Sequence, residues 1–269
     1  MGIAEVDMLQ IDVGPSRYFI SQDGSARLVG WQIGLADSSW RNVVSNGGNF
    51  RCQLNVRAMP VAGLREFEAT DVEFVRCPDA GECVIFGPKD LEQCRMCVPK
   101  FSYKLLDLSV RIEMILDNIG TFPLHWCPVI CVPIHLSWHD NLSIDQYFIR
   151  SKAKKKFILN NDLSVVESSK CSDKLPIALS EYSVLAVSGM QDYKVSIATK
   201  NGEETLSVIF CGKYPNAYFA LKQTERCNCV ELLCMPDLPC YDADFKDWPR
   251  YRCVQPSKSD SFTIELSVC

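Results

Sequence analysis

Apolar and polar residues alternate along several stretches of the chain, which is the pattern of strands with one buried face. Between residues 106 and 116 every even position is apolar, whereas most odd positions are polar or charged. The same alternation occurs at residues 29–35, 50–58 and 262–268. A helix would distribute these apolar side chains around its whole circumference, so each stretch is predicted to be a half-buried strand.

The chain segment 193–210 is predicted to form a β-hairpin. Asn201 and Gly202 are a favoured pair for a two-residue type I′ turn, in which both positions have φ > 0. Apolar residues precede and follow this turn at alternate positions, so turn chemistry and register agree. The register that follows from this turn is Tyr193 with Phe210, Val195 with Val208, Ile197 with Leu206, and Lys200 with Glu203.

A second hairpin is predicted at residues 160–161, with residues 157–159 and 163–165 as its arms. Helix signals are sparse, and short helices are predicted only at residues 62–69 and 88–97. Many short strands, 14 prolines and 14 glycines predict an all-β fold. The expected architecture is a set of antiparallel β-sandwich or barrel units with few short helices.

The chain of 269 residues is long enough for one large core or two ordinary domains. Residues 117–146 are rich in proline, which is typical of a boundary. We therefore predict an N-terminal β-rich domain at 1–120 and a C-terminal β-rich domain at 121–269, with one continuous domain as the alternative. No run of about 18 apolar residues is present, so no transmembrane segment is predicted.

Fifteen cysteines make this chain unusual in composition. Residues 1–20 lack the basic start and apolar run of a signal peptide. We therefore expect synthesis in the cytosol, where thiols stay reduced, and not secretion. The predicted location is cytoplasmic, with the nucleus as the alternative.

One cysteine cluster has a spacing that suits a structural zinc ion. Five residues separate Cys77 from Cys83, and two separate Cys94 from Cys97. Four thiolates favour tetrahedral zinc, although the first spacing is wider than in the usual zinc knuckle. Alternatively, Cys94 and Cys97 lie on the apolar face of a short helix and are core residues. No cofactor other than zinc is predicted.

A second group of metal-ligand residue types lies between residues 125 and 139. Two prolines within this segment exclude a regular helix. On an extended strand, residues four apart lie about 13 Å from each other, which is too far to share one ion. The segment is therefore predicted to be an apolar strand that tolerates its histidines. The residues concerned are His125, Cys127, Cys131, His135 and His139.

A basic run in the middle of the chain is a candidate nuclear-import signal or phosphate contact. The alternative is a solvated loop that leads into the strand at 157–159. The net charge of −5 and the isoelectric point near 5.3 argue against nucleic-acid binding by the whole protein, so such a contact would be local. The candidate residues are Arg150, Lys152, Lys154, Lys155 and Lys156.

Catalytic motifs are scarce, because the chain has three histidines and no G-x-S-x-G, P-loop or G-x-G-x-x-G sequence. Aromatic residues in polar segments are instead candidate interface anchors, namely Trp40, Trp138, Trp248 and Tyr251. The sequence thus predicts a non-catalytic protein that self-associates or binds a macromolecule. Viral structural, matrix, tegument and movement-type proteins, which take part in host–virus interaction, are the kinds expected.

Two alternative functions remain open at the level of sequence. The cysteine clusters and the basic run are consistent with a zinc-stabilised binding module, in the cytoplasm or the nucleus. A cysteine- or histidine-centred enzyme is the second alternative, because nucleophile and base can come together from distant parts of a chain. Bound metal would distinguish the first alternative, and a single unusually reactive thiol would distinguish the second.

Overall fold

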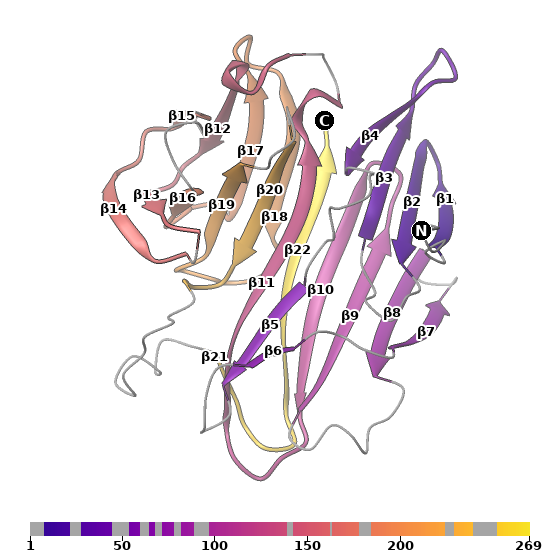
Figure 1. Cartoon of the computed structure of the whole chain (residues 1–269), viewed down its shortest axis with the longest axis vertical. Helices are drawn as coiled ribbons and strands as arrows, with labels where there is room; N and C mark the ends of the chain where they lie inside the picture. The colour runs from indigo at the N-terminus through magenta and orange to yellow at the C-terminus, as the bar shows by residue number, and fades with distance from the viewer. Residues whose placement is uncertain are drawn as a thin grey trace, which may run out of the picture.

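The structure of the chain is a computed structural model with two antiparallel β-sheets packed face to face (Figure 1). The residues described are 8–21, 28–44, 54–59, 65–67, 72–77, 82–88, 97–138, 142–161, 163–177, 184–223, 229–238 and 252–269. Within them the helices are two single-turn 3₁₀ helices, η2 (Leu136–Trp138) and η3 (Ile144–Gln146). The all-β antiparallel prediction is confirmed.

Among the described residues the larger sheet has 13 strands in the order β1-β2-β3-β4-β11-β20-β19-β16-β13-β14, with β5 and β21 also paired to β11 and β6 paired to β5. Its strands are β1 (Met8–Val13), β2 (Ser16–Ser21), β3 (Leu28–Gly34), β4 (Trp40–Val44), β5 (Leu54–Met59), β6 (Arg65–Phe67), β11 (Leu124–His135), β13 (Lys155–Leu159), β14 (Val165–Lys170), β16 (Val184–Ser188), β19 (Tyr218–Gln223), β20 (Cys229–Met235) and β21 (Arg252–Val254).

The part of the smaller sheet that the structure describes has nine strands in the order β15-β12-β17-β18-β22-β10-β9-β8-β7. Its strands are β7 (Val72–Cys77), β8 (Glu82–Pro88), β9 (Cys97–Leu105), β10 (Ser109–Asn118), β12 (Tyr147–Ser151), β15 (Lys174–Pro176), β17 (Lys194–Thr199), β18 (Glu204–Phe210) and β22 (Ser259–Val268).

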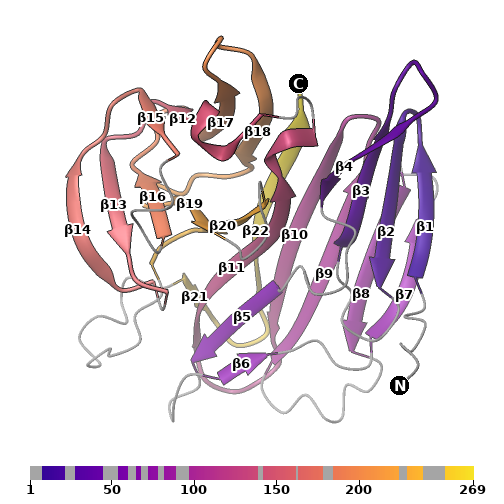
Figure 2. The same ribbon diagram turned by 45° about the horizontal axis from the view of Figure 1, so that its top comes forward.

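Each sheet contains strands from both halves of the chain, as Figure 2 shows by colour. The central pair of the smaller sheet joins β10 to β22, with Ile112 opposite Ile264. In the larger sheet, β4, which precedes residue 120 in the sequence, pairs with β11, which follows it. A boundary near residue 120 therefore does not separate one sheet from the other.

The main hydrophobic core lies between the two sheets. On β10 the predicted alternation is observed, and Ile112 and Met114 are completely buried. On β22 the residues Phe262, Ile264 and Leu266 are buried in the same way. Each such side chain contributes about 1.5–3 kcal/mol to the stability of the fold by leaving water. The prediction for 262–268 is thus confirmed, and that for 106–116 is confirmed from residue 109 onward.

A second apolar cluster lies on the other face of the larger sheet, which we call the outer face. Here β11 contributes Val129 and Cys131, whereas its alternate residues Ile130 and Val132 belong to the main core. Because both faces of β11 are covered, its sequence is almost continuously apolar instead of alternating. The buried members of the outer cluster are Val129, Cys131, Phe157, Leu159, Leu163, Val184, Ala186, Ala220, Leu233 and Met235.

The hairpin of β17 and β18 has the predicted register but a different turn. Val195 pairs with Val208, Ile197 pairs with Leu206, and the amide of Phe210 donates to the carbonyl of Tyr193. A bulge after Ile197 then places Thr199, and not Lys200, opposite Glu203.

The turn itself uses only one left-handed residue. Gly202 has a φ of 92°, whereas Asn201 does not have a positive φ. The type I′ prediction is therefore wrong. Glycine alone takes the left-handed position, and the bulge absorbs the extra residue.

The second hairpin, between β13 and β14, is confirmed, with Leu159 opposite Val165.

The predicted helix at 62–69 is wrong where it is described, because residues 65–67 form β6. The predicted helix at 88–97 falls between β8 and β9, and its residues 89–96 lie outside the described part of the chain. Within that part, no helix has the length and apolar character needed to span a bilayer.

Candidate functional site

The four cysteines of the predicted zinc site are not all brought together. Cys77 and Cys83 are directly opposite each other on β7 and β8. Cys83 also pairs with Lys104 of β9, whereas Cys97 is at the far end of β9 and is buried in the core. Lys104 is seven positions from Cys97 along the extended strand, or roughly 23 Å. Cys94 lies outside the described residues.

The segment with the histidines forms the long strand β11, as predicted for its described residues. His125 is opposite Cys253 of β21, and Cys131 lies in the outer apolar cluster. Cys127 donates through its thiol to the carbonyl of Asp237 at 3.3 Å. His135 ends the strand. His139 lies outside the described residues.

The basic run is divided between the two sheets. Arg150 belongs to β12, where it donates to the carbonyl of Gly202 at 3.3 Å and lies 3.7 Å from the Glu204 carboxylate. Lys152 lies 3.8 Å from Asp192 in the connection that follows. The last two residues of the run, Lys155 and Lys156, begin β13 in the larger sheet.

The predicted aromatic anchors differ in exposure. Trp40 is 41% exposed, and the guanidinium carbon of Arg17 lies 4.1 Å from the centre of its ring. Trp138 is only 7% exposed, because η2 carries its ring into the core. It therefore offers no exposed anchor, which corrects that prediction. Trp248 and Tyr251 lie outside the described residues.

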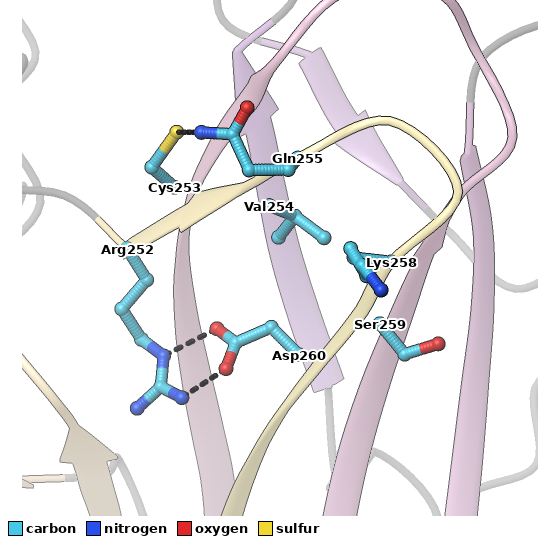
Figure 3. A pocket seen from close by; sticks show the side chains of 7 residues that line it. All are labelled: Arg252, Cys253, Val254, Gln255, Lys258, Ser259 and Asp260. Carbon is cyan, nitrogen blue, oxygen red and sulfur yellow. Dashed lines mark hydrogen bonds and ion pairs between the residues drawn. The ribbon is translucent and has the colours of Figure 1, made fainter.

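A hollow of about 460 Å³ opens where β21 turns into β22 (Figure 3). Its polar centre is the ion pair of Arg252 and Asp260, in which two guanidinium nitrogens donate to the carboxylate. The indole nitrogen of Trp126 also donates to Asp260, at 2.6 Å. The guanidinium carbon of Arg252 lies 5.1 Å from the centre of the Tyr214 ring.

This ion pair joins the two sheets, because β21 and β11 belong to the larger sheet and β22 belongs to the smaller one. The carboxylate of Asp260 is occupied by three donors, and Arg252 is neutralised by it. We conclude that these two residues stabilise the sandwich and are poorly suited to chemistry on a ligand.

A different set of polar residues is gathered on the outer face of the larger sheet. Glu231 of β20 is directly opposite Lys222 of β19 on one side and Pro133 of β11 on the other. His135 is opposite Cys229 and is therefore a diagonal neighbour of Glu231 on the same face. Such neighbours are about 7–8 Å apart, which is within reach of long side chains such as glutamate and histidine.

The environment of Glu231 makes its carboxylate a stronger base than usual. Burial raises the pKa of Glu231, and the positive charge of Lys222 partly opposes this effect. Burial likewise lowers the pKa of His135, so its imidazole is neutral near pH 7. A basic carboxylate beside a neutral imidazole is an arrangement suited to moving protons to and from a bound molecule.

The outer apolar cluster continues directly from this polar group. Leu233 follows Glu231 on the same face of β20, and Cys131 faces it from β11. Phe157 and Tyr218 lie further along this face, with their ring centres 5.2 Å apart. The residues of this cluster are largely buried, so Glu231 and His135 lie at the border of an apolar layer, which is consistent with burial shifting the pKa values of both groups.

Comparison with solved structures reveals the same fold elsewhere. A galactose mutarotase related enzyme from Lactobacillus acidophilus superposes with a TM-score of 0.76 at 10% identity, over 98% of this chain and 97% of that chain. A galactose mutarotase-like protein from Lactobacillus casei gives 0.73 at 12% identity, over 98% and 100%. The present chain therefore has the fold of the galactose mutarotase-like proteins.

A homologue of aldose epimerases from C. elegans gives a TM-score of 0.63 at 8% identity, over 98% of this chain and 99% of that chain. No family model and no curated protein matches the sequence. The mutarotase-like sandwich thus extends over almost the full length of the chain, although little of the sequence is shared.

These likenesses overturn the predicted function. The sequence predicted a non-catalytic viral structural, matrix, tegument or movement-type protein, whereas proteins with this architecture include mutarotase-related enzymes. The prediction was wrong because it relied on the absence of linear motifs. On a β-sheet, residues that are distant in the sequence can become neighbours on adjacent strands, as His135 and Glu231 do.

Sequence reasoning considered His135 but missed Glu231 and Lys222. One signal was available, because Glu231 is the only charged residue in the strand sequence CVELLCM of β20. A carboxylate in an otherwise apolar strand carries a desolvation cost and is therefore a candidate functional group. Its pairing with Lys222 and its position beside His135 follow from sheet register, which the sequence did not reveal.

Proposed function

We propose that this protein is a sugar-binding enzyme of the aldose epimerase type, which interconverts the anomers of a free sugar. The observation that carries this proposal is the position of Glu231 beside His135 and Lys222, on the outer face of a mutarotase-like sheet.

The chemistry of anomer interconversion needs one base and one acid. The base removes the proton from the anomeric hydroxyl, and the acid supplies a proton to the ring oxygen as the ring opens. In our proposal Glu231 is the base, because burial raises its pKa. The N–H of His135 donates a hydrogen bond to the ring oxygen, which takes its proton from a water molecule as its bond to the anomeric carbon breaks. The hydroxide that remains is neutralised by the proton that Glu231 has taken up, and Lys222 orients the Glu231 carboxylate. No redox cofactor takes part in such a reaction.

The test is a set of polarimetry measurements on freshly dissolved α-D-galactose and α-D-glucose. Wild-type protein is expected to accelerate the approach to anomeric equilibrium. Glu231→Gln keeps the shape of the side chain but removes the base, so it should lower the rate by about a hundredfold or more. His135→Asn should lower the rate in the same direction.

The matched control is Glu265→Gln, because Glu265 pairs with Arg111 at 2.8 Å in the smaller sheet, away from the proposed site. This variant is expected to retain the wild-type rate. Equal rates for Glu231→Gln and wild type would show that Glu231 is not the base, and the proposed mechanism would then fail.

A further inference from the structure

The last strand of the larger sheet, β14, has a free edge. It pairs with β13 on one side and has no other partner strand among the described residues (Figure 1). All six of its residues are exposed, including Val165 at 51% and Val166 at 61%. Because neighbouring residues of a strand point to opposite faces, both faces of β14 are open.

The hydrogen bonds around β13 show which backbone groups face this edge. The amide of Cys171 donates to the carbonyl of Lys154 at 3.1 Å. Bonded and non-bonded pairs alternate in an antiparallel ladder, so Ser169 and Glu167 bond to β13. The N–H and C=O groups of Ser168 and Lys170 therefore point away from the sheet, which is the template for an added strand.

Positive charge is concentrated beside this edge. Lys155 and Lys170 are directly opposite each other on β13 and β14. Neither lysine takes part in an ion pair among the described residues. Glu167 does not neutralise Lys170, because residues three positions apart on a strand point to opposite faces of the sheet. Like charges directly opposite each other destabilise a sheet unless an anionic partner is present.

We propose that β14 is a docking edge for an extended acidic segment of a partner protein, which adds to the larger sheet as a further strand. The backbone groups of Ser168 and Lys170 would bond to this segment, as in other cases of strand addition. An acidic side chain beside Lys170 would neutralise the lysine pair, and the exposed valines would contact its apolar atoms. This surface is separate from the proposed catalytic group at Glu231.

The test uses a fluorescein-labelled ten-residue peptide of alternating threonine and glutamate, with fluorescence anisotropy as the measurement. Wild-type protein is expected to bind it, with weaker binding at high salt. The double variant K155Q/K170Q should bind about fivefold more weakly, since two exposed charge contacts are lost. The same peptide with lysine in place of glutamate should not bind.

A backbone variant separates strand addition from simple charge attraction. Ser168→Pro removes the outward N–H without removing a bond to β13, so it should abolish peptide binding. Ser168→Ala keeps the N–H and is the matched control, with wild-type affinity expected. Independently of whether the proline variant folds, hydrogen exchange of wild-type protein should show that the peptide protects the Ser168 and Lys170 amides.

Three results would overturn the proposal. The first is absence of binding, which would mean that the lysines only protect the edge against aggregation. The second is binding without protection of these two amides, which would leave a purely electrostatic contact. The third is a concentration-dependent dimer that protects the same amides without peptide, because the occupant would then be a second copy of the chain.

Discussion

Glu231 shows how a residue can be unfavourable for the fold and still suit a function. Its carboxylate is partly buried in a strand whose other residues are mostly apolar, and the raised pKa records the cost of keeping it ionised there. Catalytic groups commonly carry such a cost, because a desolvated carboxylate is a better base. Burial also explains why His135 beside it is neutral, since burial lowers the pKa of the imidazole.

This cost predicts a pH-dependent gain in stability for Glu231→Gln. The native pKa of Glu231 is raised, so its contribution to stability is most favourable below the unfolded value of about 4.3 and is lost as pH rises through the native value. The variant should thus be more stable than wild type at pH 7, by on the order of 1 kcal/mol. Urea denaturation at pH 4 and pH 7 measures this.

The difference between the two proteins should shrink at pH 4, where the glutamate is largely protonated in both states. Glu265→Gln is again the control, because it removes the 2.8 Å ion pair of Glu265 with Arg111 and is not expected to stabilise the protein at pH 7. A Glu231→Gln variant that is less stable than wild type at pH 7 would show that the charged group stabilises the fold.

At the scale of elements, alternation was sufficient to predict strands such as β10 and β22, because one face of each packs on the core. It was insufficient for β11, whose two faces are both buried, and for the turn after β17, where bulge and glycine set the geometry. Local pattern reports the burial of one face, but it does not report which strands become neighbours. That is why the group formed by Glu231 and His135 was not found.

The turn at Gly202 gives a prediction at this scale. Gly202 has a φ of 92°, and a Cβ at this position would meet nothing within 4 Å, so Gly202→Ala should destabilise through backbone conformation alone. The expected loss is roughly 1–2 kcal/mol.

Gly34→Ala is the matched comparison, because Gly34 lacks a positive φ and a Cβ there would make ordinary contacts at 3.5 Å. The effect of Gly34→Ala on the free energy of unfolding should be close to zero. Thermal or urea denaturation of both variants and wild type measures the two effects. Equal effects of the two substitutions would mean that the left-handed conformation of Gly202 is not required.

At the scale of the whole molecule, the two sheets are joined by their core and by polar links such as the pair of Arg252 and Asp260 (Figure 3). Removing one member leaves a partly buried guanidinium without its partner. Asp260→Asn should therefore cost about 2 kcal/mol, with allowance for the partial exposure of the pair.

The control for this substitution is Asp12→Asn, which breaks the more exposed ion pair of Asp12 and Arg17 at 3.0 Å. Its effect should lie within about 0.5 kcal/mol of zero. If the two variants lose stability equally, the link between the sheets has no special role.

The sharing of strands between the halves of the chain predicts cooperative unfolding. Tryptophan fluorescence and far-UV circular dichroism should report one coincident transition, because neither half contains a complete sheet. Two separated transitions would instead support independent domains at 1–120 and 121–269.

In our proposal the mutarotase-like sandwich places Glu231 and His135 where they can move protons on a sugar. The most direct measurement is saturation-transfer NMR of the anomeric protons of galactose and glucose, with and without wild-type protein. We predict exchange between the anomers that is faster with protein than in buffer and that is lost in Glu231→Gln. Exchange at the buffer rate for both sugars, with folded protein present, would contradict the account.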